Sequence, residues 1–201
     1  MNNMDGFERR RELKKKDILE AALELFMKYG VQKVSIAEIA KEANVSQVTI
    51  YNYFDSKNNL IHLVFKFYVD QIWDEMKVLL ASNLPYEDKI KQMISFEKNM
   101  ANHSMNNKFF QDLLKDYATG QSYVEEVYLK EGLPLLIEFV NDGKNQGFID
   151  PSLSNEAILF YLQMFQEYMQ RDDVVHTLLP LSEDLTKLFF YGIVGKKEKQ
   201  S

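Results

Sequence analysis

Residues 35–57 read SIAEIAKEANVSQVTIYNYFDSK, a pattern that predicts two short helices joined by a tight turn. The first helix starts at a capping box: the Ser35 oxygen can accept the Glu38 N–H, and the Glu38 carboxylate can accept the Ser35 N–H. Asn44 can end that helix, because asparagine tolerates the left-handed backbone of a tight turn. Ser46 is placed to cap the second helix.

Longer helices are expected on both sides of this pair. Downstream, Ser56 can cap a helix that runs to about residue 82, and upstream Gly30 can end a helix over 10–29 with a positive φ. Residues 1–60 therefore predict the order helix, helix, tight turn, helix. The upstream helix is indicated by apolar residues at spacings of three and four, namely Ile18, Ala22, Leu25, Phe26 and Tyr29.

The rest of the chain keeps the helical period and shows no convincing strand pattern. Gly132 and Pro134 are expected to kink or divide one of its helices. The fold class is therefore expected to be all-α, with an N-terminal domain over 1–56 and a C-terminal domain over 57–201. The later helices are expected near 86–103, 107–118, 122–146, 154–171 and 182–194.

The composition excludes several classes of protein. The 201 residues are 46% apolar and 27% charged, which is typical of a globular chain and not of a disordered one. The absence of cysteine excludes disulfides, thiolate zinc sites, iron–sulfur clusters and a cysteine nucleophile. No apolar run approaches the roughly 18 residues that a membrane span needs, and the N-terminus lacks the apolar stretch of a secretory signal. We therefore expect a cytoplasmic protein that does not contact membranes.

The charge is unevenly distributed along the chain. The net charge of −6 argues against a protein that coats nucleic acid. Residues 1–60 hold 10 Lys and Arg against 9 Asp and Glu, so the remainder carries a net charge of −7. Residues 9–16 alone hold six cations around one acid. Such a run is often only a solvated helix face, but a basic end on an acidic body also fits a head that binds phosphates.

The two short helices fit a helix-turn-helix unit, whose second helix enters the major groove of DNA. At 100° per residue Ile50 and Phe54 share one face of that helix, and we expect them to pack on Phe26 and Ile39. An asparagine on the other face can bond an adenine edge twice, and valine or threonine methyls can contact thymine. On spacing alone, a helical hairpin inside a larger bundle remains the alternative. The residues expected on the outer face are Val48, Thr49, Tyr51 and Asn52.

Residues 12–62 resemble the DNA-binding head of the TetR family of transcriptional regulators. The resemblance implies about nine helices: a three-helix head with the helix-turn-helix, joined to a helical bundle that binds a ligand and dimerises. It also implies a homodimeric repressor on a roughly palindromic operator in double-stranded DNA, released by a small hydrophobic effector. The residues that carry the resemblance are Ile18–Phe26, Gly30, Ser35–Ala40, Ala43, Val45, Ser46, Tyr51, Phe54, Ser56, Lys57 and Leu60.

The resemblance assigns roles to single residues as well. It implies phosphate contacts by Ser35, Tyr51 and Lys57. A lysine at a helix start is electrostatically misplaced unless a phosphate lies beside it, which independently favours this role for Lys57. The family usually has a smaller residue where Val48 stands, so we expect a methyl contact there instead of a close backbone approach. The other residues expected to contact DNA are Ser46, Gln47, Val48, Thr49, Asn52 and Tyr53.

Methionine and aromatic residues are frequent in the body of the chain. At helical spacing most of them are expected to be plain core, but together they also suit a pocket for a flat or hydrophobic ligand. The helix near 154–171 is apolar around much of its girth, so we expect it to form a dimer interface of four helices with the helix near 182–194. The candidate pocket residues are Phe65, Tyr68, Ile72, Met93, Phe96, Met100, Phe110, Tyr117, Tyr161, Met164, Phe165 and Tyr168.

Catalytic interpretations find little support in the sequence. His62, His103 and His176 are scattered, without the spacing of a metal site. There is no Gly-rich loop that could bind phosphate and no Gly-x-Ser-x-Gly elbow. We therefore expect no enzymatic activity, no cofactor and no metal. The remaining alternatives are an activator, a DNA-binding protein that senses a protein partner, and an all-α enzyme or small-molecule carrier.

Overall fold

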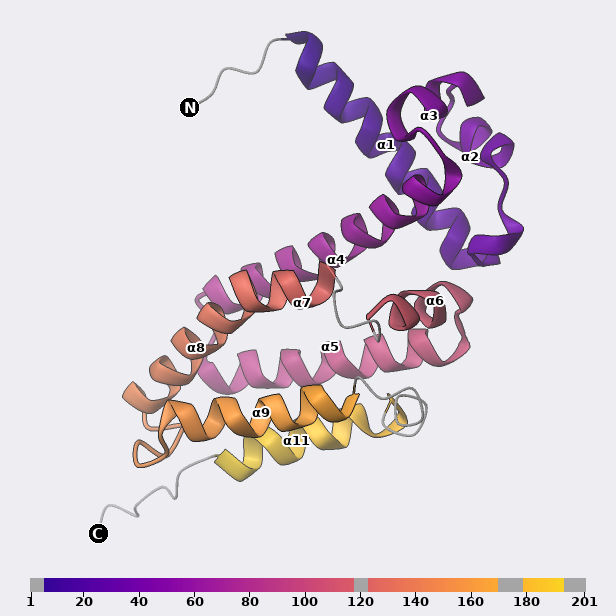
Figure 1. The fold of residues 1–201 in the computed structure, drawn as a ribbon. Helices are drawn as coiled ribbons and strands as arrows, with labels where there is room; N and C mark the ends of the chain where they lie inside the picture. Colours follow the sequence, from indigo (N-terminus) through magenta and orange to yellow (C-terminus); the bar gives the residue numbers. More distant parts are fainter. Residues whose placement is uncertain (1–5, 118–122, 170–178, 194–201) are drawn as a thin grey trace. The chain divides into compact units, whose positions relative to one another are not determined.

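The computed structural model describes residues 6–117, 123–169 and 179–193, except for the side chains of 97–106, 114–117, 165–169, 179, 182 and 193. Over these ranges the chain forms helices and no β-strand, which confirms the all-α prediction (Figure 1). No helix in the described ranges is long and apolar enough to cross a membrane. The α-helices are α1 (Gly6–Tyr29), α2 (Ile36–Glu42), α3 (Gln47–Phe54), α4 (Lys57–Ala81), α5 (Tyr86–Asn106), α6 (Lys108–Tyr117), α7 (Tyr123–Val127), α8 (Leu133–Asn145), α9 (Asn155–Met169) and α11 (Ser182–Ile193).

The predicted helix limits differ from the structure at a few ends. α1 begins at Gly6 and not at residue 10, since no proline interrupts its charged first turns. The predicted break near Gly132 is confirmed: α7 passes into a π-helical turn, η2 (Tyr128–Gly132), and α8 follows with Pro134 in its first turn. A proline there removes one N–H that an unbroken helix would need, and the turn absorbs the change.

The chain divides into two compact units, each of which is described by itself. Unit 1 consists of Met1–Ile72 and Asn107–Leu113, so it contains the predicted head, most of α4 and the start of α6. Unit 2 consists of Trp73–Asn106 and Leu114–Ser201. Each unit has its own buried apolar side chains.

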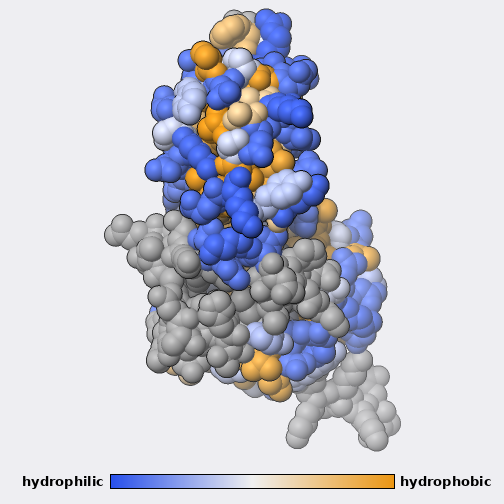
Figure 2. Space-filling view, turned by 90° about the vertical axis from the view of Figure 1, so that its right-hand side faces the viewer, coloured by the Kyte–Doolittle hydropathy of each residue, from blue (hydrophilic) through white to orange (hydrophobic). Residues whose placement is uncertain are grey.

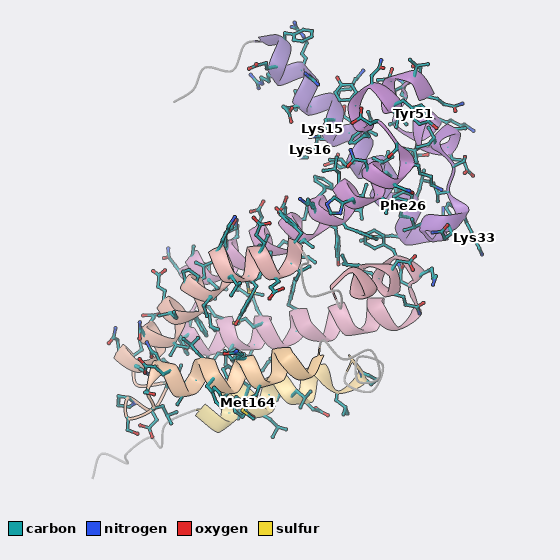
Figure 3. The ribbon with its side chains drawn as sticks, in the orientation of Figure 1. Lys15, Lys16, Phe26, Lys33, Tyr51 and Met164 are labelled. Carbon is teal, nitrogen blue, oxygen red and sulfur yellow. The ribbon has the colours of Figure 1, made fainter. Side chains whose placement is uncertain are left out.

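The core of unit 1 holds α2 and α3 in place. The predicted inward residues of α3, Ile50 and Phe54, are at most 1% exposed, and so are Phe26 of α1 and Ile39 of α2 (Figure 3). Replacing a fully buried phenylalanine by alanine typically costs about 3–5 kcal/mol, so this burial strongly favours one position for α3. A second cluster joins α4 to the start of α6, with ring centroids 5.2–5.7 Å apart, through Phe65, Tyr68, Phe109 and Phe110.

The core of unit 2 is built around Tyr86. Its ring stacks on Phe139 at 4.5 Å and on Phe148 at 5.1 Å, and its hydroxyl donates a hydrogen bond to the Phe139 carbonyl at 3.2 Å. Burial raises the pKa of Tyr86, so the hydroxyl stays protonated and can donate. Gly143 of α8 lies against this hydroxyl, where any side chain would collide with it. The other buried members are Ile90, Ile94, Val140, Ile149, Ile158, Phe189 and Phe190.

Candidate nucleic-acid interface

The start of α2 is held by the predicted capping box. The Glu38 N–H donates to the Ser35 hydroxyl oxygen at 3.2 Å, and the Ser35 N–H donates to the Glu38 carboxylate at 2.7 Å. The Ser35 hydroxyl also donates to that carboxylate, at 2.7 Å. These bonds from the Ser35 side chain and backbone hold the pKa of Glu38 below its ordinary value, and the Lys57 ammonium adds a smaller effect in the same direction. Ser35 and Lys57, both predicted to contact phosphate, therefore both act on the Glu38 carboxylate.

The turn between α2 and α3 has the predicted left-handed residue. Asn44 has a φ of 51°, and the Val45 N–H closes the turn on the Ala40 carbonyl at 2.9 Å. Ser46 then caps α3 by accepting the Thr49 N–H at 3.0 Å, and the two hydroxyl oxygens lie 2.8 Å apart. Because the Thr49 hydroxyl already has a local partner, its methyl group is the part more available to a ligand.

The end of α3 depends on Asp55, where the sequence predicts that the helix is interrupted, and on a contact from Asn59 that the sequence does not predict. Asp55 has a φ of 61°, and its N–H donates to the Tyr51 carbonyl at 2.8 Å. The Asn59 side chain, one turn into α4, donates to the Phe54 carbonyl at 3.0 Å. The rule that identified Asn44 could also have found Asp55, since both side chains tolerate the left-handed region. Nothing in the local spacing points to Asn59, because its bond joins two helices.

The outer face of α3 carries apolar as well as polar side chains. Val48 is 66% exposed and Tyr51 is 47% exposed, although Ile50 between them is buried. Gln47 and Asn52 are exposed, and Tyr53 and Lys57 are half-buried. Figure 3 places Tyr51 on α3, and Figure 2 shows hydrophobic side chains among hydrophilic ones on the surface of unit 1. This mixture suits a DNA groove, which offers both hydrogen-bonding edges and thymine methyl groups.

Comparison with known proteins agrees with this geometry. The family described as "Bacterial regulatory proteins, tetR family" matches residues 18–64, from the middle of α1 to the first two turns of α4. The chain belongs to the TetR family. It is a DNA-binding transcriptional regulator with a helix-turn-helix formed by α2 and α3.

Relatives of this TetR-family chain extend over most of its length. It is 28% identical over 145 residues to the uncharacterized HTH-type transcriptional regulator YhgD of Bacillus subtilis, covering 69% of this chain and 73% of that one. It is 23% identical over 184 residues to the fatty acid metabolism regulator protein of B. subtilis, covering 89% and 95%. The structure of FadR from B. subtilis in complex with stearoyl-CoA has the same fold, with a TM-score of 0.54 at 20% identity and coverages of 89% and 98%.

The predicted pocket residues of this TetR-family chain fall in both units. Phe65, Tyr68 and Phe110 lie together in unit 1, each at most 9% exposed, so they pack mainly on one another and on Phe109. Ile72 ends the α4 part of unit 1. In unit 2, Met93 packs against the core and Phe96 is half-buried, whereas Tyr161 and Met164 are 41% and 52% exposed. The side chains of Met100, Tyr117, Phe165 and Tyr168 lie outside the described set.

Proposed function

We propose that this regulator is a homodimeric repressor that binds a palindromic operator through α3 and dissociates from it when the C-terminal domain binds a hydrophobic ligand. The observation that carries the DNA-binding part is the exposed face of α3, which combines an asparagine, a glutamine and two apolar side chains on a helix whose other face is buried. We keep residues 1–56 as the DNA-binding domain and 57–201 as the regulatory domain in this proposal, and we assign no catalytic step to either.

Within the operator, the side chains have separate tasks. Asn52 reads an adenine through two hydrogen bonds, and Val48 and Thr49 contact thymine methyl groups. Gln47 and Tyr53 lie at the two ends of the same helix and contact the groove beside it. Ser35, Tyr51 and Lys57 bind phosphates, which sets the position of α3 but carries no sequence information. Ser46 supports them by holding the first turn of α3.

A second copy of the chain is expected to cover the apolar surface that α9 and α11 leave exposed. Both helices bury one side in unit 2 through Ile158, Phe189 and Phe190, each at most 8% exposed. Five large apolar residues among the described side chains of these two helices are at least 41% exposed in a single chain, which favours a dimer interface over α9 and α11. Those side chains are Phe160 (65%), Tyr161 (41%), Met164 (52%), Leu188 (65%) and Tyr191 (65%).

The ligand is proposed to be a long or flat hydrophobic molecule. The support is the supply of Met and aromatic side chains in the body, together with the acyl-CoA that the B. subtilis FadR structure contains. The candidate lining is the set named from the sequence, apart from Tyr161 and Met164, which belong to the proposed dimer interface. Among its described members in unit 2, Met93 and Phe96 are half-buried. The net charge of −7 beyond residue 60 favours a cationic ligand as the alternative class.

The DNA-binding part is tested by selecting operators from random duplexes with the full chain. We expect an enriched inverted repeat, because a two-fold dimer presents two α3 helices to successive major grooves. Asn52→Ala should then cost about 1–3 kcal/mol on that operator and relax the preference at one base pair. Lys57→Ala is the matched comparison, since it should weaken all operator variants equally. A uniform loss for Asn52→Ala would contradict its role as a base reader.

The ligand part is tested by thermal shift followed by operator release. The probes are stearoyl-CoA, stearate, coenzyme A alone and the lipophilic cation rhodamine 6G. A probe that raises the melting temperature and lowers operator affinity supports the proposal. Because binding free energies are reciprocal, operator DNA must then weaken that probe by the same factor. A probe that stabilises the chain but leaves operator affinity unchanged would contradict the coupling, and transcription that rises on operator binding would identify an activator.

A further inference from the structure

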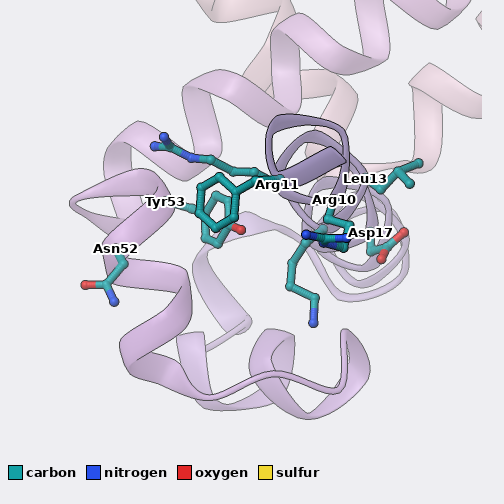
Figure 4. Close-up of a pocket in the computed structure, with 8 residues that line it drawn as sticks. Arg10, Arg11, Leu13, Asp17, Asn52 and Tyr53 are labelled. Carbon is teal, nitrogen blue, oxygen red and sulfur yellow. The ribbon is translucent and has the colours of Figure 1, made fainter. Parts of the chain in front are cut away.

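A groove in unit 1 lies between the first turns of α1 and the end of α3 (Figure 4). Its volume is about 570 Å³. Two of its lining residues, Asn52 and Tyr53, belong to α3 and are already proposed to contact DNA. The α1 residues that line it are Phe7, Arg10, Arg11, Leu13, Lys14 and Asp17. The groove is therefore continuous with the face of α3 that is proposed to read the operator.

The structure divides the basic run of residues 9–16 into two faces. Arg10 and Lys14 are four residues apart, so they lie on the same side of α1, and both line the groove. Lys16 faces another way and forms an ion pair with Glu20 at 3.4 Å. Sequence reasoning treated the run as one patch, but only some of its cations lie beside α3.

Arg11 connects the two helices that form the groove. Its guanidinium lies over the ring of Tyr53, with 5.9 Å to the ring centroid. Both side chains are labelled in Figure 4. A cation held over an aromatic face keeps its charge, and its side chain has already lost conformational freedom before any anion binds. An arginine that is already held at the mouth of the groove loses less entropy when it binds an anion.

We propose that Arg10, Arg11 and Lys14 form a second DNA-contact surface, which binds the sugar-phosphate backbone next to the major groove read by α3. This inference rests on the proposed operator binding. Arg10 and Lys14 are about 6 Å apart along the axis of α1, and a DNA strand rises about 3.4 Å per phosphate, so their side chains reach different phosphates. Phe7 and Leu13, 66% and 53% exposed, offer apolar contact to the sugars. Asp17, the acidic residue in the lining, lies about 10 Å along the axis of α1 from Arg10 and about 4.5 Å from Lys14, so Arg10 is the cation of this face that it influences less.

The experiment compares two double variants of the full chain on the operator selected with the wild type. Arg10→Ala/Lys14→Ala removes two cations of the groove, and Lys16→Ala/Lys28→Ala removes two cations of the same helix that lie outside it. Operator affinity is measured by fluorescence anisotropy between 50 and 200 mM salt. Each lost phosphate contact should reduce the slope of log affinity against log salt by about 0.9. The variant loses two cations in each subunit of the proposed dimer, so its slope should fall by about 3.6. The wild type should then lose about 150-fold more affinity than the groove variant over this salt range.

The control variant should keep the wild-type slope, and adding Arg11→Ala to the groove variant should remove about 1.8 more, about 0.9 for each subunit. Base preference should not change, since phosphate contacts carry no sequence information. Phosphate-ethylation interference on the wild type should show phosphates beside the α3 half-site that lose their effect in the groove variant. Equal slopes for the two double variants, or unchanged interference, would overturn the second surface. If the wild type selects no operator at all, the proposed function fails instead.

Discussion

Asn107 has two separable tasks in unit 1, and substitutions can measure each. Its Oδ1 accepts the Phe109 N–H at 2.9 Å, which caps the start of α6. Its Nδ2 donates to the Met27 carbonyl at 2.8 Å, which is one of the carbonyls that the end of α1 leaves without a helical partner. A single side chain thus caps one helix and joins it to the helix that supports α3. We expect both interactions to stabilise the head.

The magnitudes follow from the two bonds. Losing an N-cap costs about 1 kcal/mol, and losing one hydrogen bond between neutral groups costs about 1 kcal/mol. Asn107→Ala removes both, so it should destabilise unit 1 by about 2 kcal/mol. Asn107→Asp keeps the capping oxygen but has no donor for Met27, and a carboxylate at a helix N-terminus is favourable by about 0.3–1 kcal/mol. It should therefore cost about 1 kcal/mol at most.

Native-state hydrogen exchange can separate these outcomes. The readouts are the Gly30 amide, bonded to the Phe26 carbonyl at 2.8 Å, and the Phe109 amide. We expect exchange at Gly30 to rise about fivefold or less in Asn107→Asp, and exchange at both amides to rise about 30-fold in Asn107→Ala. If Asn107→Ala exchanges at the wild-type rate at Gly30, the bond between α6 and α1 contributes nothing. If the two variants are equally destabilised, the cap contributes nothing.

Three further predictions concern the capping box and unit 2. Bonds from Ser35 hold the pKa of Glu38 below its ordinary value, so they stabilise the head fully above that ordinary value of about 4.3. This stabilisation is lost as the pH falls further, through the lowered pKa, and the urea midpoints of wild type and Glu38→Gln should converge only below the lowered pKa. Gly143→Ala would place a Cβ against the Tyr86 hydroxyl and 2.9 Å from Ile149 Cδ1, so it should lower stability by about 1–3 kcal/mol in thermal unfolding, whereas Gly192→Ala has open space and should not. Leu188→Glu should be monomeric in light scattering and should bind the operator weakly in fluorescence anisotropy. A dimer from that variant would contradict the proposed interface. The control Val78→Glu, at a site 71% exposed on α4, should remain a dimer.

The local structure of the head could be predicted from the sequence because its signals act over a few residues. The capping box at Ser35, the left-handed Asn44 and the cap at Ser46 each depend on neighbours within three or four positions. The inward direction of Ile50 and Phe54 follows from the helical period alone. The break at Gly132 was also predictable, since proline cannot continue a helix without adjustment.

Only the tertiary structure decided which long-range partners these helices meet. The bonds from Asn59 to Phe54 and from Asn107 to Met27 join different helices, and the second spans 80 residues of sequence. Hydropathy showed that the helix near 154–171 is apolar around much of its girth, but it could not say that Ile158 is buried while Phe160 is exposed. Helical periodicity gives the relative angles of side chains on one helix. Which side faces the core depends on the packing of all the helices together, and that is determined by contacts between residues far apart in the sequence.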